Sequence, residues 1–202
     1  GTLNTAVGSY ALDATCTGSN NVAIGYKSLS ANTGGANNTG CGYQTLILNA
    51  GGDDNTALGY NALMTNAGGD DNVAVGSALR SNTEGDANIG IGTDALTANQ
   101  TGVNNVAIGH QAMKTNIDGD ASVALGYAAL YTQEPASNVD MYNTAIGYQA
   151  MYGCTVGVKN TAVGVYALDG VLTGDENTSI GYASLSSITS GSDNVAVGEG
   201  AL

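Results

Sequence analysis

The chain has 202 residues, and its four Lys and Arg residues against 17 Asp and Glu residues give a net charge of −13. This balance argues against nucleic-acid binding, which needs basic residues to neutralise phosphates, and against electrostatic docking on anionic lipid. The apolar fraction of 43% predicts a folded chain, and the absence of Trp and Phe predicts a thin, regular core.

The three cysteines, Cys16, Cys41 and Cys154, are odd in number, widely spaced and without a CxxC pair. They therefore indicate neither a disulfide framework nor a zinc site. No apolar run reaches membrane-spanning length, so we expect no membrane insertion. The chain has no signal peptide or initiator Met and begins and ends inside a repeat, so we expect a fragment of a longer polypeptide.

The whole chain repeats one nine-residue phrase, as in NTALGYNAL from Asn55 to Leu63. Successive copies start 17 residues apart, except for one spacing of 16 and one of 21. Counting from the first Asn as position 1, the twelve copies begin at Asn4, Asn21, Asn38, Asn55, Asn72, Asn88, Asn105, Ser122, Asn143, Asn160, Asn177 and Asn194. Such a repeat is typical of a solenoid, with one coil per unit.

Glycine recurs at two positions of the repeat unit. Position 5 is Gly in all twelve copies, and position 15 is Gly in ten of the eleven linking segments. A recurrent Gly supplies a positive φ angle or allows close approach of a neighbouring backbone. Two such points per unit predict a closed coil with two main corners.

The residues between the glycines predict short strands. Position 2 is Thr, Val or Ile, position 3 is small, position 4 is apolar and position 9 is Leu or Met. Positions 2–4 and 7–9 therefore read as extended segments. We expect positions 4 and 9, such as Leu58 and Leu63, to form the interior, with Ala57 facing a close neighbour.

Asn residues recur at position 1 and again at position 12 (Asn32, Asn49, Asn66, Asn82, Asn99 and Asn116). Coils stacked about 4.8 Å apart would make a rod of roughly 58 Å. Stacked Asn amides would then form hydrogen-bonded ladders from coil to coil. The alternative is that these side chains recognise a glycan.

The phrases NTAIGYQAM (Asn143 to Met151) and NVAIGHQAM (Asn105 to Met113) carry a family resemblance. They resemble the head repeats of YadA-like trimeric autotransporter adhesins and the repeat regions of bacteriophage tail fibres. The resemblance implies an all-β, left-handed parallel β-solenoid of about twelve 17-residue coils over residues 1–202, with three identical chains around one axis. It also implies an extracellular location, on a virion tail fibre or a bacterial surface, and attachment to a host cell-surface glycan or protein receptor. The unit is longer than the usual adhesin-head repeat.

The repeat is most irregular at residues 131–142, which contain four extra residues and the only Pro and lack the position-15 Gly. Insertions in solenoids bulge outward and often build binding surfaces. Tyr131, Asp140 and Tyr142 are candidate ligand-binding residues there. The alternative is a tolerated surface loop, because such insertions cost little.

Acidic residues cluster just before position 1, and Gly-Gly-Asp-Asp-Asn occurs twice, one unit apart. Stacked carboxylates repel one another, so Ca²⁺ bound between coils by Asp53, Asp54, Asp70 and Asp71 would be stabilising. The alternative is a solvated acidic turn. We expect no other cofactor.

Position 6 is Tyr in six copies and holds the only His, His110. An exposed row of rings could stack sugars, cover the turn or pack between chains. No arrangement of nucleophile, base and carboxylate is visible, so we expect no enzyme activity in this segment. The sequence therefore predicts a structural or adhesive fibre segment; an ice-binding solenoid or a polysaccharide-depolymerase fibre is the alternative.

Overall fold

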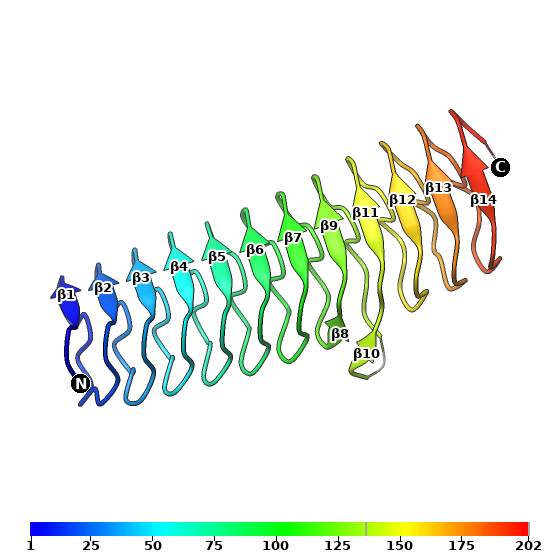
Figure 1. The fold of residues 1–202 in the computed structure, drawn as a ribbon. Helices are drawn as coiled ribbons and strands as arrows, with labels where there is room; N and C mark the ends of the chain where they lie inside the picture. Colours follow the sequence, from blue (N-terminus) through cyan, green and yellow to red (C-terminus); the bar gives the residue numbers. More distant parts are fainter. Residues whose placement is uncertain (136, 202) are drawn as a thin grey trace.

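The computed structural model is a parallel β-solenoid whose coils lie side by side along one axis, with the termini at opposite ends (Figure 1). It describes residues 1–135 and 137–201, and this part of the chain contains strands and turns but no helix. Twelve strands pair in chain order in one parallel sheet: β1 (Thr5–Val7), β2 (Val22–Ile24), β3 (Thr39–Cys41), β4 (Thr56–Leu58), β5 (Val73–Val75), β6 (Ile89–Ile91), β7 (Val106–Ile108), β9 (Val123–Leu125), β11 (Thr144–Ile146), β12 (Thr161–Val163), β13 (Thr178–Ile180) and β14 (Val195–Val197). The predicted all-β parallel β-solenoid with a repeat of about 17 residues is confirmed.

Each strand contains positions 2–4 of one copy and pairs with the same positions of the next. Thr56 lies opposite Val73, Ala57 opposite Ala74 and Leu58 opposite Val75. The 16-residue unit keeps this register, because Val73 also lies opposite Ile89. Each position of the repeat therefore forms one continuous row along the rod.

The predicted second extended segment at positions 7–9 is wrong, because these positions form a turn. Asn61 and Leu63, at positions 7 and 9, have φ angles of 56° and 49°. Strands need negative φ, so a backbone that alternates in and out of the left-handed region cannot be extended. The expected positive φ at position 5 is present, with 127° at Gly59, where a Cβ atom would lie 2.8 Å from the carbonyl oxygen of Gly76.

The interior contains positions 3, 8 and 9, so the prediction is correct for position 9 and wrong for positions 3 and 4. Leu63 and Ala57 are fully buried, whereas Leu58 is 48% exposed. Each coil contributes one strand to the twelve-stranded sheet, and the small position-3 side chain of that strand faces the bulky position-9 side chain of the turn across a thin core. A Cβ atom on Gly90, at position 3, would lie 3.0 Å from Ala78 Cβ and 3.1 Å from Leu79 Cγ. Only small residues fit at position 3, and the branched residue at position 4 must therefore point outward.

The predicted Asn ladders are present at both positions. At position 12, Asn66 Nδ2 donates to Asn49 Oδ1 and to the Gly69 carbonyl oxygen, both at 2.8 Å. At position 1, the Asn55 backbone N–H donates to Asn38 Oδ1 at 2.9 Å, and Asn55 Nδ2 donates to Gly69 O at 2.8 Å. These side chains are fully buried, so their amides must find partners inside the protein.

Candidate interaction surface

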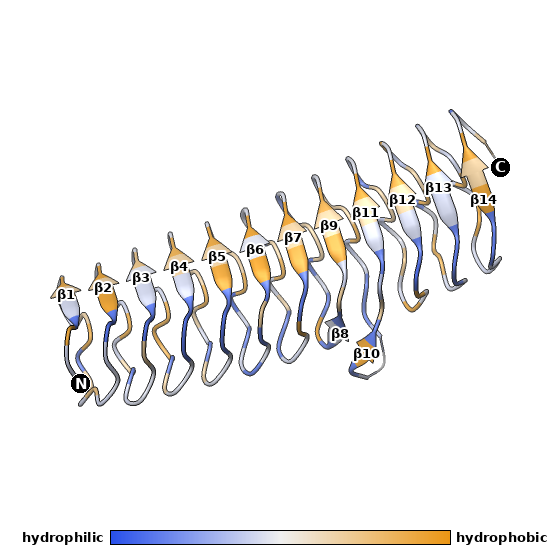
Figure 2. Ribbon diagram, in the orientation of Figure 1, coloured by the Kyte–Doolittle hydropathy of each residue, from blue (hydrophilic) through white to orange (hydrophobic). Residues whose placement is uncertain are grey.

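The outer face of the sheet, which we define as the side chains of positions 2 and 4, is apolar at position 4 in every coil and carries Thr, Val or Ile at position 2. Alternation along each strand turns both positions away from the core. Ile24, Ile146 and Ile180 are 39–40% exposed. The strands range from white to orange in Figure 2, whereas the segments that enter them are blue. A single chain thus leaves a regular row of Val, Ile and Leu side chains in contact with water.

An aromatic row at position 6 borders the outer face. The Gly at position 5 ends each strand and places the next side chain at the corner of the coil. Tyr43 stacks on Tyr26 with ring centroids 5.3 Å apart, and Tyr60 stacks on Tyr43 at 5.2 Å. Tyr127 and Tyr148 form a second stack at 4.9 Å. Within each stack the ring faces cover one another, so the ring edges face the solvent.

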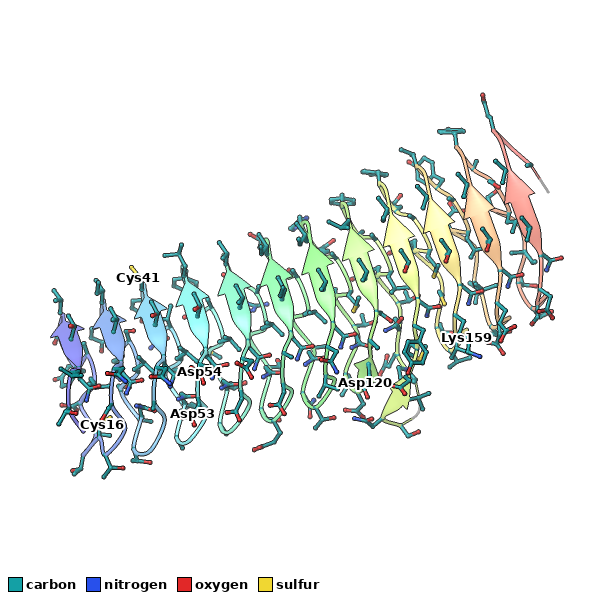
Figure 3. The ribbon with its side chains drawn as sticks, in the orientation of Figure 1. Cys16, Cys41, Asp53, Asp54, Asp120 and Lys159 are labelled. Atoms are coloured by element: carbon teal, nitrogen blue, oxygen red, sulfur yellow. The ribbon has the colours of Figure 1, made fainter. Side chains whose placement is uncertain are left out.

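The four candidate calcium ligands lie at the opposite edge of the sheet, where each strand begins. Asp53 Oδ1 accepts a hydrogen bond from the backbone N–H of Ala36, and Asp70 Oδ1 accepts one from Asp53, both at 2.7 Å. Asp54 and Asp71 follow them and are exposed, with φ angles of 57°. Figure 3 places Asp53 and Asp54 at this edge and Cys41 at the other. The position-16 carboxylates thus satisfy a backbone donor of the preceding coil.

Among residues 1–135 and 137–201, no group of three or more His, Cys, Asp or Glu side chains is arranged to hold a metal ion. Calcium binding by these four residues stays a prediction. The same part of the chain encloses no pocket, so the features that can recognise a partner are surfaces.

The irregular segment 131–142 contains β10 (Val139–Asp140), which pairs in parallel with β8 (Gly119–Asp120) of the preceding coil. Both strands lie below the main sheet in Figure 1. Tyr142 Oη donates to Asp140 Oδ2 at 2.9 Å, and this hydrogen bond raises the pKa of Tyr142. Tyr131 instead stacks on Tyr152, with centroids 5.0 Å apart. Asp140 and Tyr142 are therefore brought together, and no hydrogen bond or ring contact within the described chain joins Tyr131 to them.

Gln133, which is not among the residues predicted to form the ladders, carries the position-12 ladder into the irregular segment. Its Nε2 donates to Asn116 Oδ1 at 3.1 Å, and its Oε1 accepts from Ser122 Oγ at 3.1 Å and from Asn143 Nδ2 at 3.0 Å. Gln133 is fully buried. It follows Asn116 by 17 residues, and this spacing was a signal that could have found it.

Asp120 on β8 is 5% exposed and lies opposite Asp140 of β10. Its Oδ1 accepts a hydrogen bond from the Val103 backbone N–H at 2.7 Å. Burial is the main cause that raises the pKa of Asp120, and the nearby charges of Asp140 and Asp118 raise it further.

The three cysteines are free. Cys154 is buried at the position-12 row, where Asn143 Nδ2 lies 3.9 Å from its sulfur, and burial raises the pKa of its thiol to about 12. Cys16, at position 13, also reaches this row, where its sulfur accepts a hydrogen bond from Asn32 Nδ2 at 3.3 Å. Cys41 is at position 4, which we expected in the interior, and it is instead half-buried on the outer face.

The fold and surface together define a parallel β-solenoid with an uncovered apolar face and an aromatic edge. The described residues contain no helix of the length and apolar character that a membrane crossing requires. Comparison of the chain with protein-family models, with curated proteins and with solved structures gives no match.

Proposed function

We propose that this chain is a segment of a trimeric extracellular fibre, in a phage tail fibre or a bacterial surface adhesin, that serves attachment to a host cell-surface glycan or protein. The observation that carries the proposal is the outer face of the sheet. Val7, Leu58 and Val197 on this face are 48–68% exposed in a single chain, from one end of the rod to the other.

A continuous exposed apolar face marks an interaction surface in soluble proteins. A second copy of this chain has the same coil-to-coil spacing as this face. It can therefore make the same contact at every coil, because each row of side chains then meets an equivalent row. Three copies around an axis parallel to the rod would close such a contact into a defined assembly. The Tyr row and the acidic edge would remain available for contacts with the host.

Mass measurement in solution tests the trimer. Three chains of 20.0 kDa predict a particle of about 60 kDa. The double substitution Val106→Glu and Ile108→Glu places two charges on the outer face of β7 and should shift the mass towards the monomer. As a control with equal charge change, Gln100→Glu with Ser187→Glu alters exposed turn residues and should leave the trimer intact. A wild-type chain that stays monomeric at micromolar concentration would contradict the assembly.

One observation favours a second candidate, an ice-binding solenoid. The outer face carries a Thr at position 2 in half of the coils: Thr5, Thr39, Thr56, Thr144, Thr161 and Thr178. The row is interrupted from Val73 to Val123, where every position-2 residue is Val or Ile. Clear thermal hysteresis would make ice binding the primary role, and its absence would remove this candidate.

A further inference from the structure

The coil from Asn72 to Ala87 has 16 residues, and the residue that it lacks is position 7. In a complete coil, the position-7 N–H donates to the position-6 carbonyl oxygen of the preceding coil, as Asn61 does to Tyr43 at 3.0 Å. Here Ser77 Oγ donates to the Tyr60 carbonyl oxygen at 2.7 Å. The side-chain hydroxyl thus replaces the missing backbone donor, and the φ angle of Gly76 falls to 89°.

The same coil interrupts the aromatic row. The rings stop at Tyr60 and resume at His110, with Ser77 and Thr93 at position 6 between them. Tyr60 stacks on Tyr43, and His110 lies against Tyr127 with ring centroids 5.5 Å apart. Each terminal ring therefore has one face without an aromatic neighbour. Three coil steps of about 4.8 Å separate the two rings by about 14 Å along the rod, which leaves room for a ring-shaped ligand.

A cationic cluster lies beside this gap. Arg80 Nη2 is 2.8 Å from Asp94 Oδ1, and Lys114 Nζ is 3.3 Å from Asp94 Oδ2. Asp94 directly follows Thr93, so the cluster borders the floor of the gap. Two cations share one carboxylate and leave one positive charge in excess. The side chains of Arg80 and Lys114 are 36% and 28% exposed, so both can reach a ligand.

Hydrogen bonding is also incomplete here. In the part of the chain that the structure describes, three buried side-chain atoms have no partner: Asn61 Oδ1, Arg80 Nε and Thr97 Oγ1. Arg80 belongs to the shortened coil itself, and Asn61 and Thr97 belong to the coils before and after it. Elsewhere the Asn ladders give buried polar atoms a hydrogen-bond partner in each coil. Around the shortened coil, some buried polar atoms lack such a partner.

The net charge is −13, but the charges are distributed so that an anion can approach the edge of the rod that carries the aromatic row. Between Asn21 and Ala121, positions 6–11 carry Lys27, Arg80 and Lys114 against Asp94 alone. The other acidic residues of these coils lie at positions 14–17, at the opposite edge, where Figure 3 labels Asp53, Asp54 and Asp120. The three residues of each strand alone span about 10 Å, so the two edges are more than one Debye length apart in physiological salt.

We propose that this gap binds an acidic saccharide, with a sugar ring stacked on Tyr60 or His110 and its carboxylate or sulfate held by Arg80 and Lys114. Sugar rings stack their C–H faces on aromatic rings, and guanidinium and ammonium groups bind anionic oxygens. Thr93, exposed at position 6 between the two rings, offers its hydroxyl for a further hydrogen bond. The proposal rests on the attachment function and names its ligand class.

Binding measured by titration calorimetry tests the site on the chain in its solution assembly. The probes are tetragalacturonate, its methyl ester and a sulfated galactose tetrasaccharide. We expect an acidic probe to bind, at least tenfold more tightly than the methyl ester, with affinity that falls as salt is raised. Arg80→Gln with Lys114→Gln should weaken binding at least tenfold. The matched control, Lys27→Gln with Lys159→Gln, makes the same charge change away from the gap and should bind as the wild type does.

Thr93→Tyr gives a test that does not depend on charge. Tyr occupies this position in other coils, so the variant should fold with an unchanged melting temperature while its ring fills the gap and abolishes binding. Equal binding by the Arg80 and Lys114 variant, equal binding of the methyl ester, or no binding of either acidic probe overturns the site. The trimer mass is unaffected by these outcomes, so failure of this site is distinguishable from failure of the fibre proposal.

Discussion

At the scale of single residues, buried amides connect the coils. An Asn side chain has a donor and an acceptor at the same end, so it can accept from one coil and donate within its own. Asn66 uses both, since its Oδ1 also accepts from Asn82 Nδ2 at 2.7 Å. The row continues unbroken from Asn32 to Asn116, which makes each amide dependent on its neighbours.

Asn66→Ala should lower the free energy of unfolding by about 2–3 kcal/mol, because it leaves Asn49 Oδ1 buried without a donor. Denaturant unfolding measures the change. Gln100→Ala, in an exposed turn, is the control and should stay within about 0.5 kcal/mol of the wild type. Equal effects of the two substitutions would contradict a structural role for the ladder.

At the scale of elements, each coil combines one short strand with a turn whose backbone is strained. Non-glycine residues such as Asn61 and Leu63 have left-handed φ angles, at a cost of order 1 kcal/mol each. Coil-to-coil hydrogen bonds hold them there: Leu63 N–H donates to the Ala78 carbonyl oxygen at 3.1 Å. The turn is therefore stable only in a stack, and a single coil has no means of forming it.

The strand pair β8 and β10 is a second element that contains an unfavourable interaction, because it places the carboxylates of Asp120 and Asp140 side by side. The raised pKa of Asp120 means that the folded state penalises its charged form. Asp120→Asn should therefore stabilise the protein at pH 7 by roughly 0.2–1 kcal/mol, the range for charged cross-strand pairs. The amide oxygen retains the bond from Val103.

This advantage should shrink as the pH falls through the raised pKa of Asp120, because the folded wild type then takes up a proton more readily than the unfolded chain. Melting temperatures between pH 7 and pH 4 measure it. Asp86→Asn is the matched control: Asp86 Oδ1 makes the equivalent bond to the Asp70 backbone at 2.8 Å but is exposed. A stabilisation of Asp120→Asn that does not depend on pH would contradict the electrostatic cause.

At the scale of the whole molecule, the strands within the described residues contact only strands of adjacent coils, so stability is a sum of local contributions. Removal of residues 55–71, one complete unit, should therefore preserve the fold, because Asn38 then meets Asn72 in the same register. Removal of residues 55–63 alone should abolish cooperative unfolding, because it breaks every row at once. Circular dichroism and denaturant unfolding compare the two deletions. Collapse of the one-unit deletion would contradict the nearest-neighbour picture.

The candidate surface was only partly predictable. The spacing of the repeat predicted the Tyr row. The interruption between Tyr60 and His110 became a candidate site only because the structure places the salt bridges of Arg80 and Lys114 to Asp94 beside it. These residues are 14 and 20 positions from Asp94 in the chain, and only the stacking of coils brings them together. Asp140 and Tyr142 form a pair as neighbours in sequence, whereas Tyr131 packs on a ring of the next coil.

The sequence alone determined the solenoid, its unit and its ladders, because a 17-residue period forces equivalent residues into rows whatever the shape of the coil. The direction in which each row points needed the tertiary structure. Leu58 and Ala57 exchange the places expected of them, because the left-handed turn brings Leu63 back against the strand and leaves space there only for Ala57. Side-chain volume therefore decides that the small residue at position 3 lies inside and the larger residue at position 4 outside. Hydrophobicity alone could not predict this, because Ala57 and Leu58 are both apolar.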